Sequence, residues 1–163
     1  MPEPETIIEL ELGCRPEAAI SGAVLVQTER SAFLTFNAMR PTDRVSPYGG
    51  HYVEEAGIAL VEFPTCAITK FGYPNDEAWN GIPRTRGLGY GIFEVLNSGW
   101  IRELTELNRH SFPKTAENTT SRHFLFLFHD SSFECIASVM KLEIIPRPYA
   151  NVFARITDRV LAE

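Results

Sequence analysis

The most apolar stretch of the chain, HFLFLFHDSSFECIASV from His123 to Val139, constrains the fold more than any other segment. Its three alternate phenylalanines, from Phe124 to Phe128, would lie on one face of an extended strand, with two leucines on the other face. A strand that is apolar on both faces is typical of the middle of a sheet that is covered on both sides. We therefore expect the rest of the chain to pack around this strand.

The polar residues from His129 to Ser132 predict a turn that brings the following segment back as a hairpin partner. A loop of two or four residues is expected to place Phe128 opposite Cys135, Phe126 opposite Ala137 and Phe124 opposite Val139. The same register sets His129 directly opposite Glu134, with their Cβ atoms about 5 Å apart.

Further strands are predicted at 5–12, 58–63, 65–71 and 92–96, and residues 21–39 are predicted to form two strands joined by the polar tip Glu29-Arg30-Ser31. The second strand of the central hairpin is expected to continue through Met140 to Ile145. The segment from Arg40 to Tyr52 is rich in Pro, Gly and Ser and is predicted to be a loop. Helical spacing predicts one short turn at 75–80, a helix capped by Ser98 and a final helix at 149–161. The expected fold class is α+β, mainly β: an antiparallel sheet or sandwich with two to three short helices packed on it.

Size and charge narrow the classes of protein further. A chain of 163 residues is expected to form a single globular domain spanning 1–163. Its net charge of −6 argues against sequence-independent binding to nucleic acid.

No apolar run is long enough to cross a bilayer, and the acidic start MPEPETIIELELG lacks a basic leader, so we expect a cytoplasmic protein with no membrane segment. Three widely spaced cysteines, Cys14, Cys66 and Cys135, indicate reduced thiols.

The predicted pair of His129 and Glu134 is the main catalytic candidate, because a carboxylate beside an imidazole orients the ring and raises its pKa. The alternative is a polar pair that closes the end of a hairpin. Ser131 and Ser132 could suggest a Ser-His-acid arrangement, but neither lies in a G-x-S-x-G turn between a strand and a helix.

The sequence gives little support to a metal site or a cofactor site. His123 and His129 are six residues apart on one predicted strand, roughly 20 Å, so they would not share an ion. No HxH, HExxH or CxxC spacing occurs, and we expect no metal and no cofactor. The glycines at 87–91, preceded by Arg84 and Arg86, are followed by a predicted strand rather than the helix that a phosphate-binding loop requires.

Three phrases between Gly72 and Ala137, GYPNDEAWNGIP, GLGYGIFEVLNSGWIRELTELNRH and HFLFLFHDSSFECIA, together resemble a family of small uncharacterised bacterial proteins. The shared motifs are PNDEA, EVxNSxWIxxL and HFxFxFHDSxFECIA. In that family the position of Ile82 is often histidine, so a role for that imidazole is not carried over. The resemblance implies a bacterial cytoplasmic setting, and it draws attention to a set of polar and aromatic residues: Asn75, Asp76, Glu77, Asn97, Trp100, His110, His129 and Glu134.

Two functional hypotheses follow. The first is a non-enzymatic binding or regulatory module that recognises a protein partner, as immunity proteins do, or a small polar ligand, with Asn75, Asp76, Glu77, Asn97, Trp100 and His110 as candidate binding residues. It rests on the negative charge and on the lack of a strong catalytic motif. The second is a small hydrolase-like or lyase-like enzyme that uses His129 and Glu134, with Asp76 or Glu77 completing a cleft. The second hypothesis requires the PNDEA loop and the hairpin tip to converge on one concave pocket.

Overall fold

The computed structural model describes residues 3–114 and 120–163, which form ten strands and three helices. The strands are β1 (Thr6–Glu9), β2 (Arg15–Pro16), β3 (Val24–Gln27), β4 (Ala32–Val45), β5 (His51–Phe63), β6 (Cys66–Gly72), β7 (Gly91–Leu96), β8 (Arg122–Leu127), β9 (Ser132–Ala137) and β10 (Lys141–Ile145). The helices are α1 (Asp76–Trp79), α2 (Gly99–Ser111) and α3 (Tyr149–Leu161).

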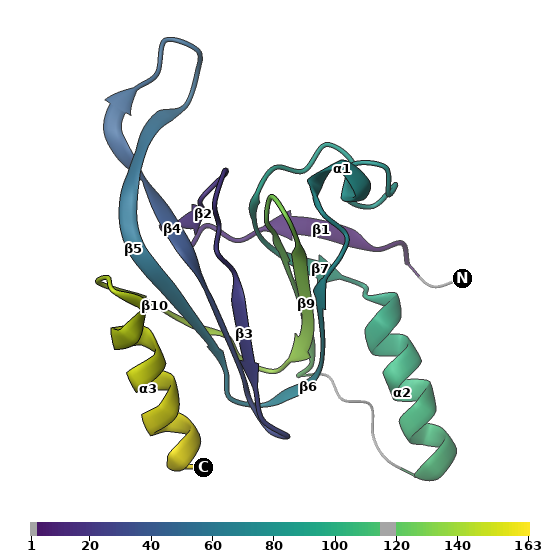
Figure 1. The fold of residues 1–163 in the computed structure, drawn as a ribbon. Coiled ribbons are helices and arrows are strands. Elements are labelled where there is room, and N and C mark those ends of the chain that lie inside the picture. Colours follow the sequence, from purple (N-terminus) through teal and green to yellow (C-terminus); the bar gives the residue numbers. More distant parts are fainter. Residues whose placement is uncertain (1–2, 115–119) are drawn as a thin grey trace.

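The strands form two antiparallel sheets that face each other (Figure 1). The first sheet has the order β1-β7-β8-β9-β6, which places β8 at its centre, as its two apolar faces predict. The second sheet has the order β10-β5-β4-β2, and β3 also pairs with β4. All the pairings are antiparallel, so the predicted α+β, mainly β class with an antiparallel sandwich is confirmed.

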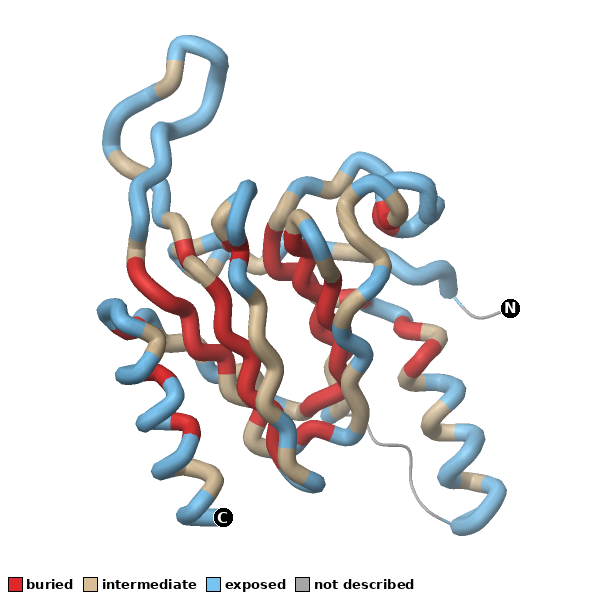
Figure 2. Tube along the Cα trace, in the orientation of Figure 1, coloured by how far each residue is buried: buried red, intermediate tan, exposed pale blue. Residues whose placement is uncertain are grey.

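Phenylalanines dominate the core between the two sheets. Three come from β8 and the residue after it, one from β9, and one each from β4 and β5: Phe124, Phe126, Phe128, Phe133, Phe36 and Phe63. Their rings meet at centroid distances of 5.5–6.4 Å, mostly edge-on or tilted, which is the favourable geometry for aromatic pairs. Figure 2 shows this buried centre running along the facing strands.

Helices cover the outer face of each sheet. Helix α3 buries Val152 and Ile156 against Phe33, Ile58 and Leu60 of the second sheet. On the first sheet, Trp79 of α1 packs with apolar residues of β7 and β8, and α2 lies beside β8. None of the described helices has both the length and the apolar composition needed to cross a bilayer.

The hairpin register differs from the prediction. Phe126 lies opposite Phe133, Phe124 opposite Cys135 and Leu125 opposite Glu134, so His129 does not face Glu134. The loop has two residues, one of the two expected lengths, but it lies earlier in the chain: the N–H of Phe128 donates to the carbonyl of Ser131 and leaves only His129 and Asp130 at the tip. The predicted faces are nevertheless correct, and this register lets Phe133 join the aromatic core.

Two other predictions are wrong. Residues 140–145 do not extend β9: the chain leaves the first sheet after Ala137, and β10 pairs with β5 in the second. The expected loop from Arg40 to Tyr52 is mostly strand, because β4 reaches Val45 and β5 begins at His51. The Pro, Gly and Ser residues that suggested a loop lie mainly in the tip at 46–50.

The outer parts of β4 and β5 project beyond the sandwich as a two-stranded arm, residues 40–54 (upper left in Figure 1), and are largely exposed (Figure 2). The arm starts at a bulge, where the pairing shifts between Ala38 and Met39. Gly57 lies at this bulge with φ +122°, and a Cβ there would be 2.8 Å from the carbonyl oxygen of Ile145. Glycine is therefore required where the arm leaves the sheet.

Candidate functional site

A polar cluster lies where α1 meets the tip of the β8–β9 hairpin. The N–H of Asp76 donates to the carbonyl of His129, and the side chain of Asn75 caps α1 by accepting from the N–H of Ala78. The phenol of Tyr90 donates to Asp76 at 2.7 Å and stacks beside His129. The PNDEA segment and the hairpin tip therefore converge, and they bring Asn75, Asp76, Glu77 and His129 into one neighbourhood.

The charges of this hairpin-tip cluster act on one another. The hydrogen bond to Asp130 and the nearby charge of Asp76 raise the pKa of His129, whose Nδ1 lies 2.9 Å from an Asp130 oxygen. The hydrogen bond from Tyr90 lowers the pKa of Asp76 and raises that of the phenol. His129 is 45% exposed, so solvent screens these interactions.

A second polar cluster, the buried network, lies under the start of α2. The Oγ atom of Ser98 lies 2.8 Å from Nδ1 of His123, and Nε2 of the same ring lies 2.7 Å from Oε2 of Glu134. The guanidinium of Arg84 donates to the other carboxylate oxygen at 2.7 Å. Glu134, assigned from sequence to His129, therefore belongs to His123. The two side chains are diagonal neighbours on β8 and β9, since Glu134 lies opposite Leu125.

A neutral imidazole satisfies every bond of this network. The Ser98 hydroxyl accepts from the N–H of Ile101 as the cap of α2, and its own proton is then available for Nδ1 of His123. Nε2–H donates to Glu134. Although the order resembles a Ser-His-acid triad, Ser98 is only 4% exposed and His123 only 1%. The geometry suits a hydrogen-bonded support that fixes α2 to the first sheet.

Glu134 remains ionised within the buried network. Burial opposes its ionisation, but the hydrogen bonds from His123 and Arg84 outweigh that effect and lower the pKa of the carboxyl group to about 2. Trp100 packs against this network. Its ring meets the His123 ring edge-on with a centroid distance of 5.3 Å, and the Lys70 ammonium lies over the Trp100 ring, 3.9 Å from its centroid.

The remaining candidate binding residues do not join one site. Trp100 lies in the buried network, and its small exposed fraction makes it a packing residue. Asn97 adopts a left-handed conformation before the cap of α2, and its amide donates to the carbonyl of Pro4. His110 lies in the last turn of α2, at the opposite end from Ser98. Among residues 3–114 and 120–163 no group of three or more His, Cys, Asp or Glu side chains could hold a metal ion.

Sequence reasoning missed a cleft of about 330 Å³ at the foot of the arm, the arm-base cleft. One wall comes from the segment that links β1 to β2, and the other from the base of the arm, including Pro41, His51 and Val53. Ile92 of β7 contributes an apolar surface. A volume of this size is typical of a pocket for a small ligand.

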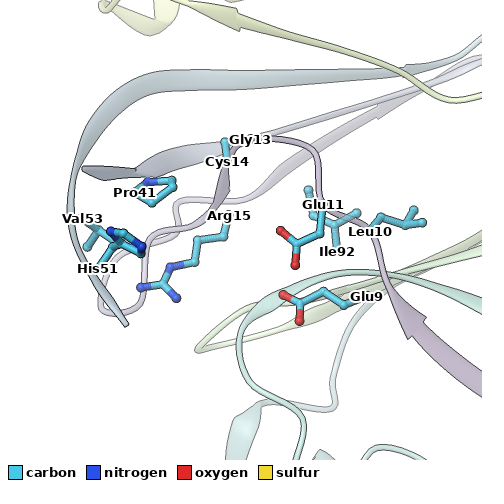
Figure 3. Close-up of a pocket in the computed structure, with 10 residues that line it drawn as sticks. All are labelled: Glu9, Leu10, Glu11, Gly13, Cys14, Arg15, Pro41, His51, Val53 and Ile92. Atoms are coloured by element: carbon cyan, nitrogen blue, oxygen red, sulfur yellow. The ribbon is translucent and has the colours of Figure 1, made fainter. Parts of the chain in front are cut away.

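Four side chains that carry a carboxylate, guanidinium or imidazole group line the arm-base cleft, beside the thiol of Cys14. Figure 3 shows the carboxylates of Glu9 and Glu11 on one side, with Arg15 extending beside His51 on the other. Within the described part of the chain, none of these four side chains makes a hydrogen bond or an ion pair with another residue. Elsewhere on the surface, arginines such as Arg40 and Arg147 do pair with glutamates.

No local sequence signal could have found this cleft. Glu9, Glu11 and Arg15 lie in a segment that links one sheet to the other, and His51 was assigned to a loop. His51 lies at the cleft because β5 pairs with β4 along the arm. Comparison with known proteins adds nothing to the assignment: no protein family, curated protein or solved structure matches this chain.

Proposed function

We propose that this chain is a non-enzymatic binding module that holds a small polar ligand in the arm-base cleft. The observation that supports the proposal is the set of side chains without partners around one cavity: Glu9, Glu11, Arg15 and His51. Here opposite charges line one cleft without pairing, which favours a polar ligand that fits between them.

The enzymatic alternative loses its residue-level support. It required His129 and Glu134 to act as one acid-base pair, but Glu134 bonds His123 and Arg84 in the buried network. His129 interacts instead with Asp130 and Asp76 at an exposed turn. A binding function without catalysis therefore agrees better with the arrangement of these residues.

The experiment that tests the proposal is a titration of the isotope-labelled full chain with a set of small amines, carboxylates, amino acids and phosphates, followed by amide NMR. We expect at least one member to shift the amides of residues 9–15, 51–53 and 92. Arg15→Ala should remove the shifts, whereas Arg86→Ala, which changes an exposed arginine outside the cleft, should not. If no compound shifts these amides, or if the shifts cluster elsewhere, the proposal fails.

The arm supports a second candidate function, recognition of a protein partner. Tyr48 at its tip is 97% exposed and Val45 is 70% exposed, and such apolar side chains on a projecting element are typical of contact surfaces. Beyond Met39 and Glu55, the described strands pair only with each other, so both outer edges are available for strand addition.

This second function can be tested by site-specific crosslinking. A photo-reactive tyrosine analogue in place of Tyr48 should trap one reproducible partner in an extract of the source cells, and arm variants such as Val45→Ser should reduce its yield. The same analogue in place of Leu107, an exposed residue of α2, is the matched control. Equal trapping from both positions would contradict partner recognition by the arm.

A further inference from the structure

We infer that the ligand of the arm-base cleft is a zwitterion, a molecule that carries a protonated amine and a carboxylate a few bonds apart, such as a free α-amino acid. This inference rests on the proposed binding function and specifies its ligand. It follows from how the two kinds of charge are separated within the cleft (Figure 3).

The side of the cleft that would hold the carboxylate contains Arg15 and His51. A guanidinium presents a planar fork of N–H donors that matches a carboxylate with two parallel hydrogen bonds. Arg15 belongs to β2 of the second sheet, and His51 begins β5 on the arm. Because they come from two different elements, these residues form a corner that a carboxylate can enter from solvent.

The side that would hold the amine contains Glu9 and Glu11. Between them, the N–H of Leu10 donates to the carbonyl of Ile92 at 2.8 Å, which continues the pairing of β1 with β7 by one residue. Leu10 packs against the core between the sheets, so its two neighbours in the extended chain project to the other side. The two carboxylates give this side of the cleft a negative charge, which an ammonium group can neutralise through charge-assisted hydrogen bonds.

The lining also disfavours ligands with only one kind of charge. A phosphate or a dicarboxylate that reached Arg15 would approach the carboxylates of Glu9 and Glu11, while a diamine would approach the guanidinium. Apolar surface from Val53, Pro41 and Ile92 lies beside these charges. An amino acid with an aliphatic side chain satisfies both charged sides and covers part of this surface.

The test is calorimetric titration of the full chain with three probes of one shape. L-leucine carries both charges, 3-methylbutylamine lacks the carboxylate, and 4-methylpentanoate lacks the amine. We expect leucine to bind, and each single-charge probe to bind about tenfold or more weakly, because each loses a charge-assisted hydrogen-bonded contact. Glycine should bind more weakly than leucine because it leaves the apolar surface uncovered.

Variants assign each charge to its side of the cleft. Arg15→Ala should weaken leucine about tenfold or more and leave 3-methylbutylamine unchanged, and Glu11→Gln should weaken leucine but not 4-methylpentanoate. Arg86→Ala and Glu103→Gln change exposed residues elsewhere and should leave all affinities unchanged. Circular dichroism of each variant checks that the fold is retained.

The outcomes separate this inference from the function on which it rests. If a single-charge probe binds as tightly as leucine, or if only a phosphate or an amine shifts the amides of the cleft, the inference of a zwitterionic ligand is wrong, while the proposed binding function stands. If leucine binds but Arg15→Ala and Glu11→Gln leave its affinity unchanged, the assignment of the ligand to these side chains is wrong. If no compound shifts the amides of the cleft, both proposals fail.

Discussion

His123 and Glu134 join the central strand β8 of the first sheet to its neighbour β9 through a bond of 2.7 Å between an imidazole nitrogen and a carboxylate oxygen. The pair is diagonal across β8 and β9, and both side chains lie on the outer face, beneath the start of α2. Arg84 and Ser98 satisfy the remaining bonds of the pair. The network therefore connects a loop, a helix cap and two strands through side chains that are far apart in sequence.

This network predicts a specific dependence of stability on pH. Folding lowers the pKa of Glu134 from its ordinary 4.5 to about 2, which corresponds to roughly 3 kcal/mol of folding free energy. Because the folded pKa is the lower one, this stability is fully present above pH 4.5 and is lost as the pH falls toward 2. Urea unfolding of the wild type and of Glu134→Gln should show a difference that is largest near pH 6 and shrinks at pH 3. A difference that stays constant with pH would contradict it.

The aromatic core predicts a large effect of a single truncation. Phe126 is fully buried and contacts the rings of Phe36, Phe63 and Phe133, so Phe126→Ala should lower the free energy of unfolding by about 3–5 kcal/mol. Phe112→Ala is the matched control, because Phe112 is largely exposed after α2. Chemical denaturation measures both variants. A loss below about 1 kcal/mol for Phe126→Ala would show that this strand is not central.

The tight turn at the hairpin tip predicts which carboxylate controls His129. Asp130 and Asp76 raise the pKa of His129, whereas Glu134 is bonded to His123. Asp130→Asn should therefore lower the pKa of His129, as followed by NMR of the ring protons, and Glu134→Gln should leave it unchanged. A response to Glu134→Gln instead would mean that the two side chains face each other after all.

The geometry at the base of the arm predicts that Gly57 cannot be replaced without a loss of stability. Gly57→Ala would place a methyl group 2.8 Å from the carbonyl oxygen of Ile145 in a backbone conformation with φ +122°. We expect a loss of at least about 1 kcal/mol in the free energy of unfolding. Gly49→Ala has similar φ strain but open space around it, so its smaller loss isolates the contribution of the steric contact. Equal losses would rule out that contact as the cause.

Elements controlled by local chemistry were predictable from the sequence. Ser98 caps α2, α3 spans Tyr149–Leu161, and β5 ends at Phe63 before β6 begins, each as predicted. The two apolar faces of β8 placed it correctly at the centre of a sheet. These features depend on side-chain patterns within a few residues, which sequence preserves directly.

Features that depend on pairing between strands were not predictable in the same way. The faces of the hairpin follow from alternation, but its register depends on a turn of two residues that allows Phe133 to meet Phe126. Two registers that differ by an even number of residues bury the same faces, so the apolar pattern does not distinguish them. The partner of Glu134 and the walls of the arm-base cleft depend on such long-range pairing.

The connections between the sheets have a consequence for how the chain can fold as it is synthesised. It crosses from one sheet to the other between β1 and β2, between β5 and β6, and between β9 and β10. Strand β6 pairs only with β9 among the described strands, and β7 needs β8 on its second edge. When the ribosome has completed α2, the first sheet therefore still lacks β8 and β9, and the apolar faces of β4 and β5 are uncovered. The emerging chain must wait for β8, β9 and α3 before either sheet is closed.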